Sequence, residues 1–425
     1  MGVRPGYKET EVGVLPAEWE VSTVGREFSV QLGKMLDAER NAGVEKPYIG
    51  NRAVQWGRID IDNLPTVAMT RSDLGKFRLR QGDLLVCEGG DVGRAAIWEA
   101  PLDECYYQKA LHRLRPLREF DPRLMVAILW QWSKRGLLAN YVTQTSIAHL
   151  PRDKFMAVPL PRPPGPEQLA IATALSDADA LLSGLDRLIA KKRDLKQAAM
   201  QQLLTGQTRL PGFHGEWKVR RLGDYVTFLR NGVNSRAELL PEGRVKYLHY
   251  GDVHACKDVG LSPTALPCLP DARAVSLDRL RDGDLIFADA SEDVPGVSKS
   301  VEMRNVGSIE VVSGLHTIAA RFDKGVLADG FKGFLQFCPP FSTHLRRLAA
   351  GTKVYATNRS HVASVEMHLP GIPEQTAIAA ALSDMDAELS ALEARRDKTC
   401  DLKQAMMQEL LTGKTRLVPA GAAHA

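Results

Sequence analysis

The 425-residue sequence has no paired cysteines, no long apolar run and no large excess of either charge. Its six cysteines are scattered without a single Cys-x-x-Cys pair, which favours reduced thiols over a disulfide framework or a zinc ribbon. The longest strongly apolar stretch, residues 124–132, is shorter than the about 20 residues that a membrane span needs. No apolar segment suited to a secretory signal lies near the start, so the sequence predicts a cytoplasmic protein without a membrane partner.

Charge and composition set further limits. The 55 lysines and arginines outnumber the 51 acidic residues by four, so any nucleic-acid surface has to come from local clustering of charge. The chain is 44% hydrophobic and 25% charged, which is ordinary for globular protein and excludes intrinsic disorder and fibrous repeats. Its length suggests about three units, each able to bury its own core.

A nearly identical segment occurs twice and organises the chain. Residues 166–210 and 373–417 are identical at 30 of 45 positions, aligned without a gap. Chance does not produce such a match, so the segments arose by duplication and we expect them to do matching jobs. Each segment begins with Pro-Glu-Gln, has no later proline and is rich in good helix formers. The pattern therefore predicts two long helices.

Proline and glycine mark the ends of both expected helices. Pro166 and Pro373 suit the first helical turn, and Gly206 and Gly413 suit a helix end. About 40 residues at 1.5 Å rise span roughly 60 Å. Apolar residues recur at heptad spacing, which predicts that the helices pair with each other. The side chains expected to form this pairing are Ile171, Leu175, Leu182, Leu185, Ile189, Ile378, Leu382, Met385, Leu389 and Leu392.

Weaker matches extend the repeat to the rest of the chain. Residues 79–85 match 280–286 around a shared Gly-Asp-Leu, and Leu111-His112 matches Leu315-His316. Outside these landmarks the two regions differ strongly in sequence. Similar scaffolds with different surfaces suit a protein that recognises two different things.

The two globular regions, about 20–160 and 215–368, lack helical periodicity over most of their length. Short β-rich runs separated by Gly, Asp and Asn predict irregular sheets, with shorter helices at 122–139 and near 326–349. The sequence thus predicts an α+β fold. Two mixed α/β domains related by a pseudo-two-fold repeat are separated by two long helices that pair as an antiparallel coiled coil.

The order of unit, helix, unit, helix resembles the specificity subunit of type I restriction-modification systems. In particular, both helices open with Pro-Glu-Gln and close with Leu-Leu-Thr-Gly. The resemblance covers essentially the whole chain. Landmarks inside the units agree with it, namely Pro47-Tyr48-Ile49 before Asn51, Gly82 to Leu85 with Gly89 and Gly93-Arg94, Tyr250-Gly251-Asp252-Val253, and 289–293 with Gly296 and Lys299.

The resemblance implies how the chain and its complex are organised. Residues 1–163 and 210–370 would be target-recognition domains, each reading one half of an asymmetric site in double-stranded DNA. The spacer helices would be 164–209 and 371–417, with a flexible tail at 418–425. Two modification subunits would dock on the helices and methylate adenine with S-adenosylmethionine. Restriction subunits would add ATP- and Mg²⁺-dependent translocation and cleavage, and the chain itself would hold no metal or cofactor and catalyse nothing.

We expect two kinds of DNA contact. Lys and Arg give affinity through phosphates, whereas polar side chains at base edges give specificity. Arg or Lys suits guanine, and Asn or Gln suits adenine. In the first domain the predicted contacts are Arg78, Arg80, Arg94, His112, Arg113, Gln144, Ser146 and His149. In the second domain they are Arg236, Tyr250, Lys299, His316, Tyr355, Asn358 and Arg359.

Other functions are weighed against this one. A coiled-coil scaffold that binds only protein is the main alternative, and it would show no affinity for DNA. An autonomous methylase or nuclease is disfavoured, because residues 338–341 (Cys-Pro-Pro-Phe) lack the Asn or Asp of an amino-methyltransferase loop and no nuclease pattern of carboxylates occurs. His249, His254, Cys256 and Cys268 fit no recurrent zinc spacing.

Overall fold

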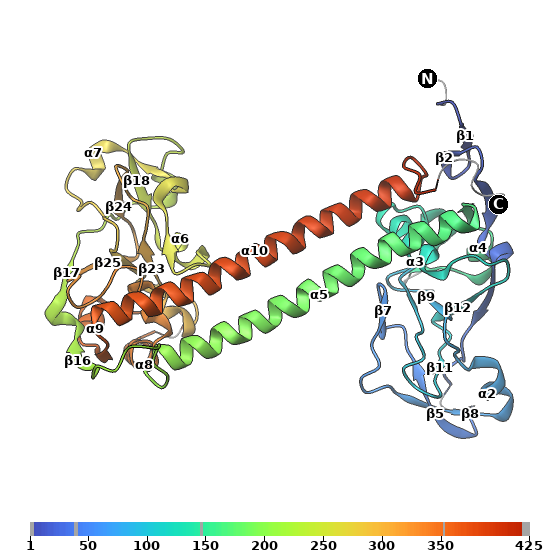
Figure 1. Cartoon of the computed structure of the whole chain (residues 1–425), viewed down its shortest axis with the longest axis horizontal. Coiled ribbons are helices and arrows are strands. Elements are labelled where there is room, and N and C mark those ends of the chain that lie inside the picture. The colour runs from blue at the N-terminus through green and yellow to red at the C-terminus, as the bar shows by residue number, and fades with distance from the viewer. Residues whose placement is uncertain (1–3, 38–40, 145–147, 352, 419–425) are drawn as a thin grey trace. The chain divides into compact units, whose positions relative to one another are not determined.

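Two helices of 39 residues, α5 (Gly165–Leu203) and α10 (Ile372–Leu410), run through the computed structural model (Figure 1). The structure describes residues 4–37, 41–144, 148–351 and 353–418. The chain divides into two compact units, unit 1 (Met1–Asp186 with Arg395–Ala425) and unit 2 (Arg187–Ala394). Each unit therefore contains one sheet-based domain and one half of each long helix. The predicted fold class is confirmed.

The ends of the long helices follow from the sequence signals. Pro166 and Pro373 lie in the first turn of α5 and α10, where the missing N–H costs no hydrogen bond. Gly206 and Gly413 have φ of 72° and 64°, a left-handed conformation that glycine adopts without strain and that ends the last turn. Each helix therefore begins and ends at equivalent positions of the repeat.

Unit 1 contains two small sheets and several two-stranded pairs. The four-stranded antiparallel sheet has the order β10 (Ala95–Ile97), β9 (Leu84–Cys87), β12 (Leu111–Pro116) and β4 (Phe28–Leu32). The three-stranded sheet has the order β11 (Tyr106–Tyr107), β5 (Val44–Ile49) and β8 (Thr66–Met69). The paired strands are β1 (Tyr7–Thr10) with β2 (Gly13–Pro16), β3 (Glu20–Thr23) with β15 (Pro159–Arg162), β6 (Val54–Gln55) with β7 (Arg58–Ile59), and β13 (Thr143–Gln144) with β14 (Ala148–His149). The helices are α1 (Val24–Glu27), α2 (Arg71–Phe77), α3 (Pro122–Arg135), α4 (Arg152–Met156) and the 3-10 helix η1 (Ala139–Tyr141).

Unit 2 is built in the same way. Its larger sheet has the order β17 (Val226–Phe228), β25 (Thr317–Phe322), β21 (Leu285–Ala288), β23 (Ser300–Met303) and β19 (Gly260–Leu261). Its smaller sheet has the order β20 (Cys268–Leu269), β18 (Val245–Leu248) and β24 (Glu310–Ser313). The paired strands are β16 (Lys218–Arg221) with β27 (Glu366–Leu369) and β22 (Ala290–Ser291) with β26 (Tyr355–Ala356). The helices are α6 (Tyr250–Ala255), α7 (Asp271–Ala274), α8 (Pro339–Leu348) and α9 (Arg359–Ala363), with 3-10 helices η2 (Leu222–Tyr225), η3 (Arg236–Glu238), η4 (Pro263–Ala265), η5 (Pro295–Ser298) and η6 (Lys332–Phe337).

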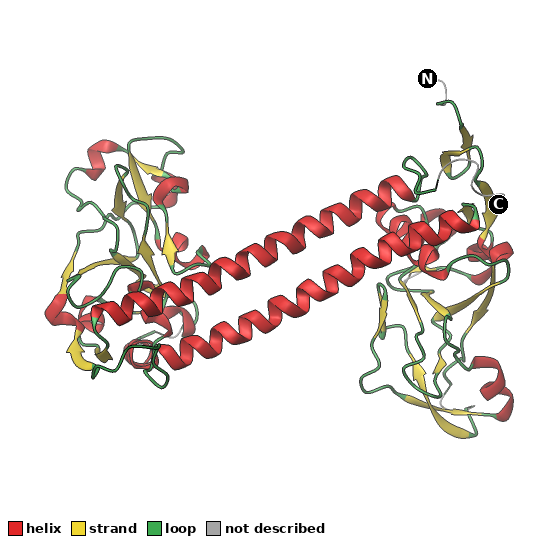
Figure 2. Cartoon of the chain, in the orientation of Figure 1, coloured by secondary structure: helices red, strands yellow, loops and turns green. Residues whose placement is uncertain are grey.

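The two domains share one topology despite their different sequences. The strand order β10-β9-β12-β4 in unit 1 corresponds to β23-β21-β25-β17 in unit 2. Each smaller sheet has one parallel pair (β11 with β5, β24 with β18) and one antiparallel pair. In each unit the strands gather beside the ends of the two long helices (Figure 2). The repeat therefore extends from the helices to the whole fold. One expectation needs correction, because the helix near 326–349 is split into η6 and α8, and α8 starts at Pro339.

Both long helices are anchored in the domain cores. In unit 1, Ile171 and Leu175 of α5 pack with Met407 and Leu410 of α10 in the main hydrophobic cluster. In unit 2, the corresponding cluster contains Ile378 and Leu382 of α10 beside Leu203 of α5. Of the side chains expected to pair the helices, seven are buried and three, Leu182, Met385 and Leu392, are half-buried. Residues near the ends of the expected pairing therefore also pack into the domain cores and hold the helices to the domains.

A charged clasp joins the helix ends in each unit. Glu167, at the start of α5, is buried and accepts a hydrogen bond from Trp19 Nε1 at 2.8 Å. Arg416, beyond the end of α10, donates to the same carboxylate from Nε at 2.5 Å and Nη2 at 2.8 Å. In unit 2, Arg209 donates in the same way to Glu374 at the start of α10. The Glu of each Pro-Glu-Gln thus binds the Arg that follows the other helix, which accounts for the identity of both motifs.

Ion pairs along the helices fix an antiparallel register within each unit. In unit 1, Asp179 of α5 pairs with Lys403 of α10. In unit 2, Lys192 pairs with Glu388 at 2.6 Å, and Lys196 pairs with Asp386. Residue numbers rise along one helix as they fall along the other, as antiparallel pairing requires. No helix in the described part of the chain is long and apolar enough to cross a membrane.

Candidate nucleic-acid interface

The strand registers show which residues of the two domains are equivalent. Asp83 and Asp284 immediately precede β9 and β21, and each is almost fully buried. Arg115 Nε and Nη2 lie 2.5 and 2.8 Å from the Asp83 oxygens, and the same atoms of Arg321 lie 2.8 and 2.6 Å from those of Asp284. Hydrogen bonding to these carboxylates raises the pKa of both arginines. The Gly-Asp-Leu motif is therefore structural, and it aligns the two sheets residue by residue.

This alignment places two predicted cations at the same position. Arg94 directly precedes β10, Lys299 directly precedes β23, and both strands pair with the central strand in the same register. Arg94 Nη2 donates to the Asn51 carbonyl at 3.0 Å, and Lys299 Nζ donates to the Cys256 carbonyl at 2.8 Å. Each cation is thus held beside the carboxyl end of its central strand. We call this end of β9 or β21, with the loops around it, the reading edge of the domain.

The reading edge of unit 2 is a cleft of about 770 Å³. Tyr250, Lys299 and His316, all predicted from the sequence, line it together with His254 and Asp293. The Tyr250 ring centroid lies 5.5 Å from that of His316 and 6.1 Å from that of His254, both nearly perpendicular. A cleft with a cation, a carboxylate and partly exposed aromatic rings can donate hydrogen bonds to a base edge, accept hydrogen bonds from it and stack on it.

His316 is held in an unusual conformation at this edge. Its φ is 56°, in the left-handed region that non-glycine residues occupy rarely and often at functional sites. Its Nδ1 lies 3.1 Å from Asp289 Oδ1, and about half of its side chain is exposed. Asp289 follows β21 directly, so the sheet itself fixes where this imidazole is presented.

The reading edge of unit 1 has the same position but different side chains. Asn51 Nδ2 donates to the Gly89 carbonyl at 3.1 Å, and Gly89 forms a β-bridge with the exposed His149. Gln144 lies on β13, which pairs with the strand that carries His149, whereas Ser146 lies outside the described residues. Arg94 and His149 are therefore brought together, with Gln144 on the adjoining hairpin.

Four predicted residues of the first domain are not presented to a ligand at this edge. His112 is fully buried, with Nε2 2.8 Å from the Leu150 carbonyl, and burial lowers its pKa to about 4. Arg113 is 5% exposed and donates to Gln31 Oε1 at 2.6 Å. Arg78 and Arg80 are exposed but precede β9, at the opposite end from the reading edge. As placed, His112 is a core residue and not a surface available to DNA.

The match between Leu111-His112 and Leu315-His316 does not reflect equivalent positions. Because Arg115 corresponds to Arg321, the strand registers align His112 with Ile318. Ile318 is also buried, whereas His316 lies in the loop before β25. A two-residue match cannot separate a strand from its preceding loop, which is why the sequence paired the wrong histidines.

The remaining predicted residues of the second domain surround its reading edge. Arg236 Nη2 pairs with Asp252 at 2.6 Å near the start of α6, and Tyr355 lies on β26, which pairs with β22 beside the cleft. Asn358 caps α9 by accepting from the His361 amide at 2.9 Å. Arg359 Nη2 donates to the Leu229 carbonyl at 2.8 Å. Asn358 and Arg359 thus have structural roles but stay exposed.

Sequence reasoning passed over several residues at these edges. Asn51 and Asp289 enter the prediction only as landmarks of the resemblance, and Glu88 is not among the predicted contacts. Burial raises the pKa of Glu88, which lies directly beyond β9. His254 was weighed as a metal ligand, but no group of His, Cys, Asp and Glu among the described residues could hold a metal ion. The sequence signal that could have found these residues is their position directly after a buried apolar strand, because the chain returns to solvent where such a strand ends.

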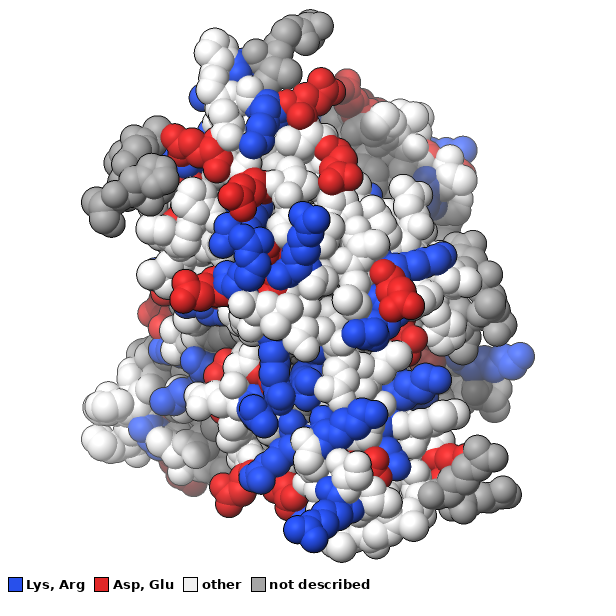
Figure 3. Space-filling view, turned by 90° about the vertical axis from the view of Figure 1, so that its right-hand side faces the viewer, with Lys and Arg blue, Asp and Glu red and all other residues white. Residues whose placement is uncertain are grey.

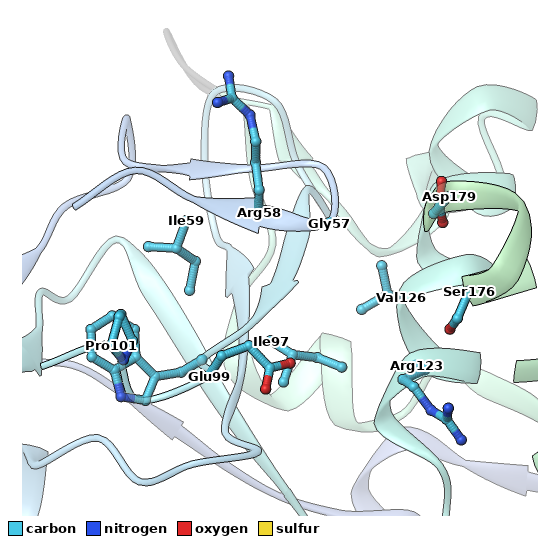
Figure 4. A pocket seen from close by; sticks show the side chains of 11 residues that line it. Gly57, Arg58, Ile59, Ile97, Glu99, Pro101, Arg123, Val126, Ser176 and Asp179 are labelled. Atoms are coloured by element: carbon cyan, nitrogen blue, oxygen red, sulfur yellow. The ribbon is translucent and has the colours of Figure 1, made fainter. Parts of the chain in front are cut away.

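Another hollow in unit 1, of about 410 Å³, is distinct from the reading edge. Arg58 of β7 and Asp179 of α5 stand on opposite walls, with Arg123 of α3 nearby (Figure 4). None of the residues predicted to contact DNA lines it. It therefore does not belong to the proposed interface.

Two units of one topology, each of which clasps one end of α5 to one end of α10, define a two-domain scaffold with an internal repeat. No family model matches the chain. It is 22% identical to the MjaX type I restriction enzyme specificity subunit of Methanocaldococcus jannaschii, over 97% of each chain, and 23% identical to the MjaVIII specificity subunit over 67% of this chain and 68% of that protein.

Solved structures share the fold. The type I restriction-modification S subunit of M. genitalium matches with a TM-score of 0.59 at 15% identity, over 96% of this chain and 98% of that one. A chain from a type I restriction-modification assembly study matches with a TM-score of 0.57 at 17% identity, over 94% of this chain and 99% of that one. The resemblance drawn from the sequence is confirmed, because the chain is similar to type I specificity subunits over nearly its full length and has their fold.

Proposed function

We propose that this chain is the DNA-specificity subunit of a type I restriction-modification complex. The observation that carries the proposal is that one scaffold presents two different sets of side chains at equivalent strand ends. In unit 2 the set is Tyr250, His316 and Lys299, and in unit 1 it is Arg94 with His149. Each reading edge recognises one half of a bipartite site in double-stranded DNA. Because the two sets differ, the site is asymmetric.

In this proposal the chain recognises DNA and catalyses nothing itself. Methylation of adenine with S-adenosylmethionine takes place on two modification subunits, and restriction subunits supply ATP- and Mg²⁺-dependent translocation and cleavage in the cytoplasm. Support for docking on the helices comes from Leu188 and Leu195, which lie one heptad apart on α5 and are 40% and 46% exposed. An apolar row outside the pairing of α5 with α10 suits a partner helix.

Domain exchange tests whether each domain reads its own half of the DNA site. Residues 1–163 are replaced by the corresponding domain of another specificity subunit, and methylated adenines are mapped in the genome of cells that also express the modification subunit. One half of the methylated sequence is expected to change while the other half persists. A change in both halves, or in neither, would overturn modular reading.

Salt dependence separates this function from a protein-binding scaffold. Site-specific binding by the assembled complex should weaken steeply as salt rises, because each phosphate contact releases counterions. A scaffold without a DNA role would show no affinity for duplex DNA at low salt. Leu188→Glu with Leu195→Glu should abolish co-purification of the modification subunit, whereas Val219→Glu, at an exposed valine on β16, should not.

A further inference from the structure

Five cations of unit 1 gather around the start of β9, and we call this surface the basic face. Its members are Lys76, Arg78, Arg80, Arg113 and Arg115. Arg113 Nη1 donates to the Lys76 carbonyl at 3.4 Å, and Arg115 Nη2 donates to the Arg78 carbonyl at 3.2 Å. Arg80 and Arg115 both lower the pKa of Arg113, although burial lowers it most. The five cations therefore lie together, with Lys76, Arg78 and Arg80 exposed at the surface.

Three of these charges are available to a ligand. Arg115 is occupied by Asp83, and Arg113 is buried against Gln31. Lys76, Arg78 and Arg80 are exposed, and none of them forms an ion pair with any carboxylate in the residues that the structure describes. Lysine and arginine gather over the side of the molecule on which α2 lies in Figure 1, as Figure 3 shows.

The equivalent surface of unit 2 serves as an internal comparison. In the alignment through the Gly-Asp-Leu motif, Arg279 and Arg281 are the equivalents of Arg78 and Arg80. Arg279, however, forms an ion pair with Glu310, which lies 2.9 Å from its Nε. Leu277 stands at the position equivalent to Lys76, and by strand register Ala319 stands at the position equivalent to Arg113. Two acidic residues, Asp278 and Asp282, replace Phe77 and Gln81. Unit 2 has thus lost cations and gained carboxylates, so only unit 1 carries the basic face.

The basic face is separate from the reading edge of the same domain. Arg78 and Arg80 precede β9, whereas Gly89 follows it. The four residues of β9 span about 13 Å at 3.3 Å per residue. A duplex presents a phosphate about every 3.4 Å along each strand, so its backbone charge continues past the recognised bases. DNA read at Gly89 can therefore reach the basic face with phosphates that lie outside the recognised bases.

Resting on the proposed function, we propose that the basic face binds the phosphate backbone of duplex DNA beside the half-site that unit 1 reads. It contributes affinity without sequence preference and does so on one side of the site only. The exposed guanidinium group of Arg78, whose Nη2 donates to the Asp103 carbonyl at 3.0 Å, suits this role, since arginine forms paired hydrogen bonds with phosphate oxygens. An acidic surface of a partner subunit is the competing occupant.

The test uses the chain assembled with its modification subunits. Arg78→Gln with Arg80→Gln removes two charges from the basic face, and Arg279→Gln with Arg281→Gln removes two from the equivalent place in unit 2. Binding to a duplex of scrambled sequence is measured as a function of salt. Losing two phosphate contacts should make the slope of log K against log salt less steep by about 1.8. Between 50 and 200 mM salt, the affinity of the unit 1 variant should therefore fall about twelvefold less than the affinity of wild type. The unit 2 variant should keep the wild-type slope.

A second measurement tests whether the added affinity comes from DNA on one side of the recognised site only. The recognised site is extended by about ten base pairs, one helical turn, on either flank. Wild type should gain affinity from one flank only, and Arg78→Gln with Arg80→Gln should lose that gain while the methylated sequence stays unchanged.

Three outcomes would overturn the proposal. An unchanged salt slope, or equal gains from both flanks, would show that the basic face does not bind flanking DNA. Reduced co-purification of the modification subunit with the unit 1 variant would assign the face to a protein partner. If wild type itself discriminates no sequence, the proposed function fails, and that result is distinct from all of these.

Discussion

Replacing Glu167 by glutamine should destabilise unit 1, because it removes a single buried negative charge. The carboxylate is 1% exposed and receives two hydrogen bonds from Arg416 and one from Trp19. Hydrogen bonds to charged groups contribute about 1.5–3 kcal/mol net, and Arg416 keeps 22% of its side chain exposed, so we expect a loss of about 2–3 kcal/mol. For a unit of this size that corresponds to a fall in Tm of about 4–12 °C.

Thermal unfolding followed by circular dichroism measures this change, and Glu20→Gln provides the control. Glu20 also pairs with an arginine, but it is 62% exposed, so its loss should cost less than about 1 kcal/mol. A double-mutant cycle of Glu167→Gln with Arg416→Gln should give a coupling of about 1.5–3 kcal/mol. Equal Tm shifts for the two glutamates, or no coupling, would refute the clasp as the link between the helix ends.

Three further predictions concern the sheets and their edges. Asp284→Asn should destabilise unit 2 by about 3 kcal/mol in urea unfolding, because it leaves Arg321 without its buried partner. Burial lowers the pKa of His112 from 6.5 to about 4, so the unfolded chain binds its proton first and stability should fall by about 3 kcal/mol as pH drops through that range. Lys299→Gln and Arg94→Gln should each relax one half of the methylated sequence, at a cost of about 1–3 kcal/mol in discrimination.

Matched variants check each of these. Asp282→Asn, at an exposed carboxylate beside the Gly-Asp-Leu motif, should leave urea stability within about 0.5 kcal/mol of wild type. His112→Gln removes the titrating ring, so its stability should change less between pH 6.5 and 4 than that of wild type; parallel curves would contradict the assignment. A change in both half-sites from Lys299→Gln alone would contradict separate reading edges.

The sequence by itself determined the helices and their partnership. Ungapped identity at 30 of 45 positions, Pro166 and Pro373 at the starts, and left-handed glycines at the ends are local signals, and helix formation depends mainly on local signals. Short β-rich runs also located β9 and β21, because a buried strand needs a continuous apolar run.

Only the tertiary structure decided which side chains face a ligand. The two histidines that look alike in sequence have opposite environments, because His112 lies within a buried strand whereas His316 lies in the loop before one. The hydrogen bond of Arg113 with Gln31 joins segments far apart in the chain, and it holds a predicted DNA contact inside the domain. The equivalence of Arg94 with Lys299 depends in the same way on hydrogen-bonded strands, which no local pattern records.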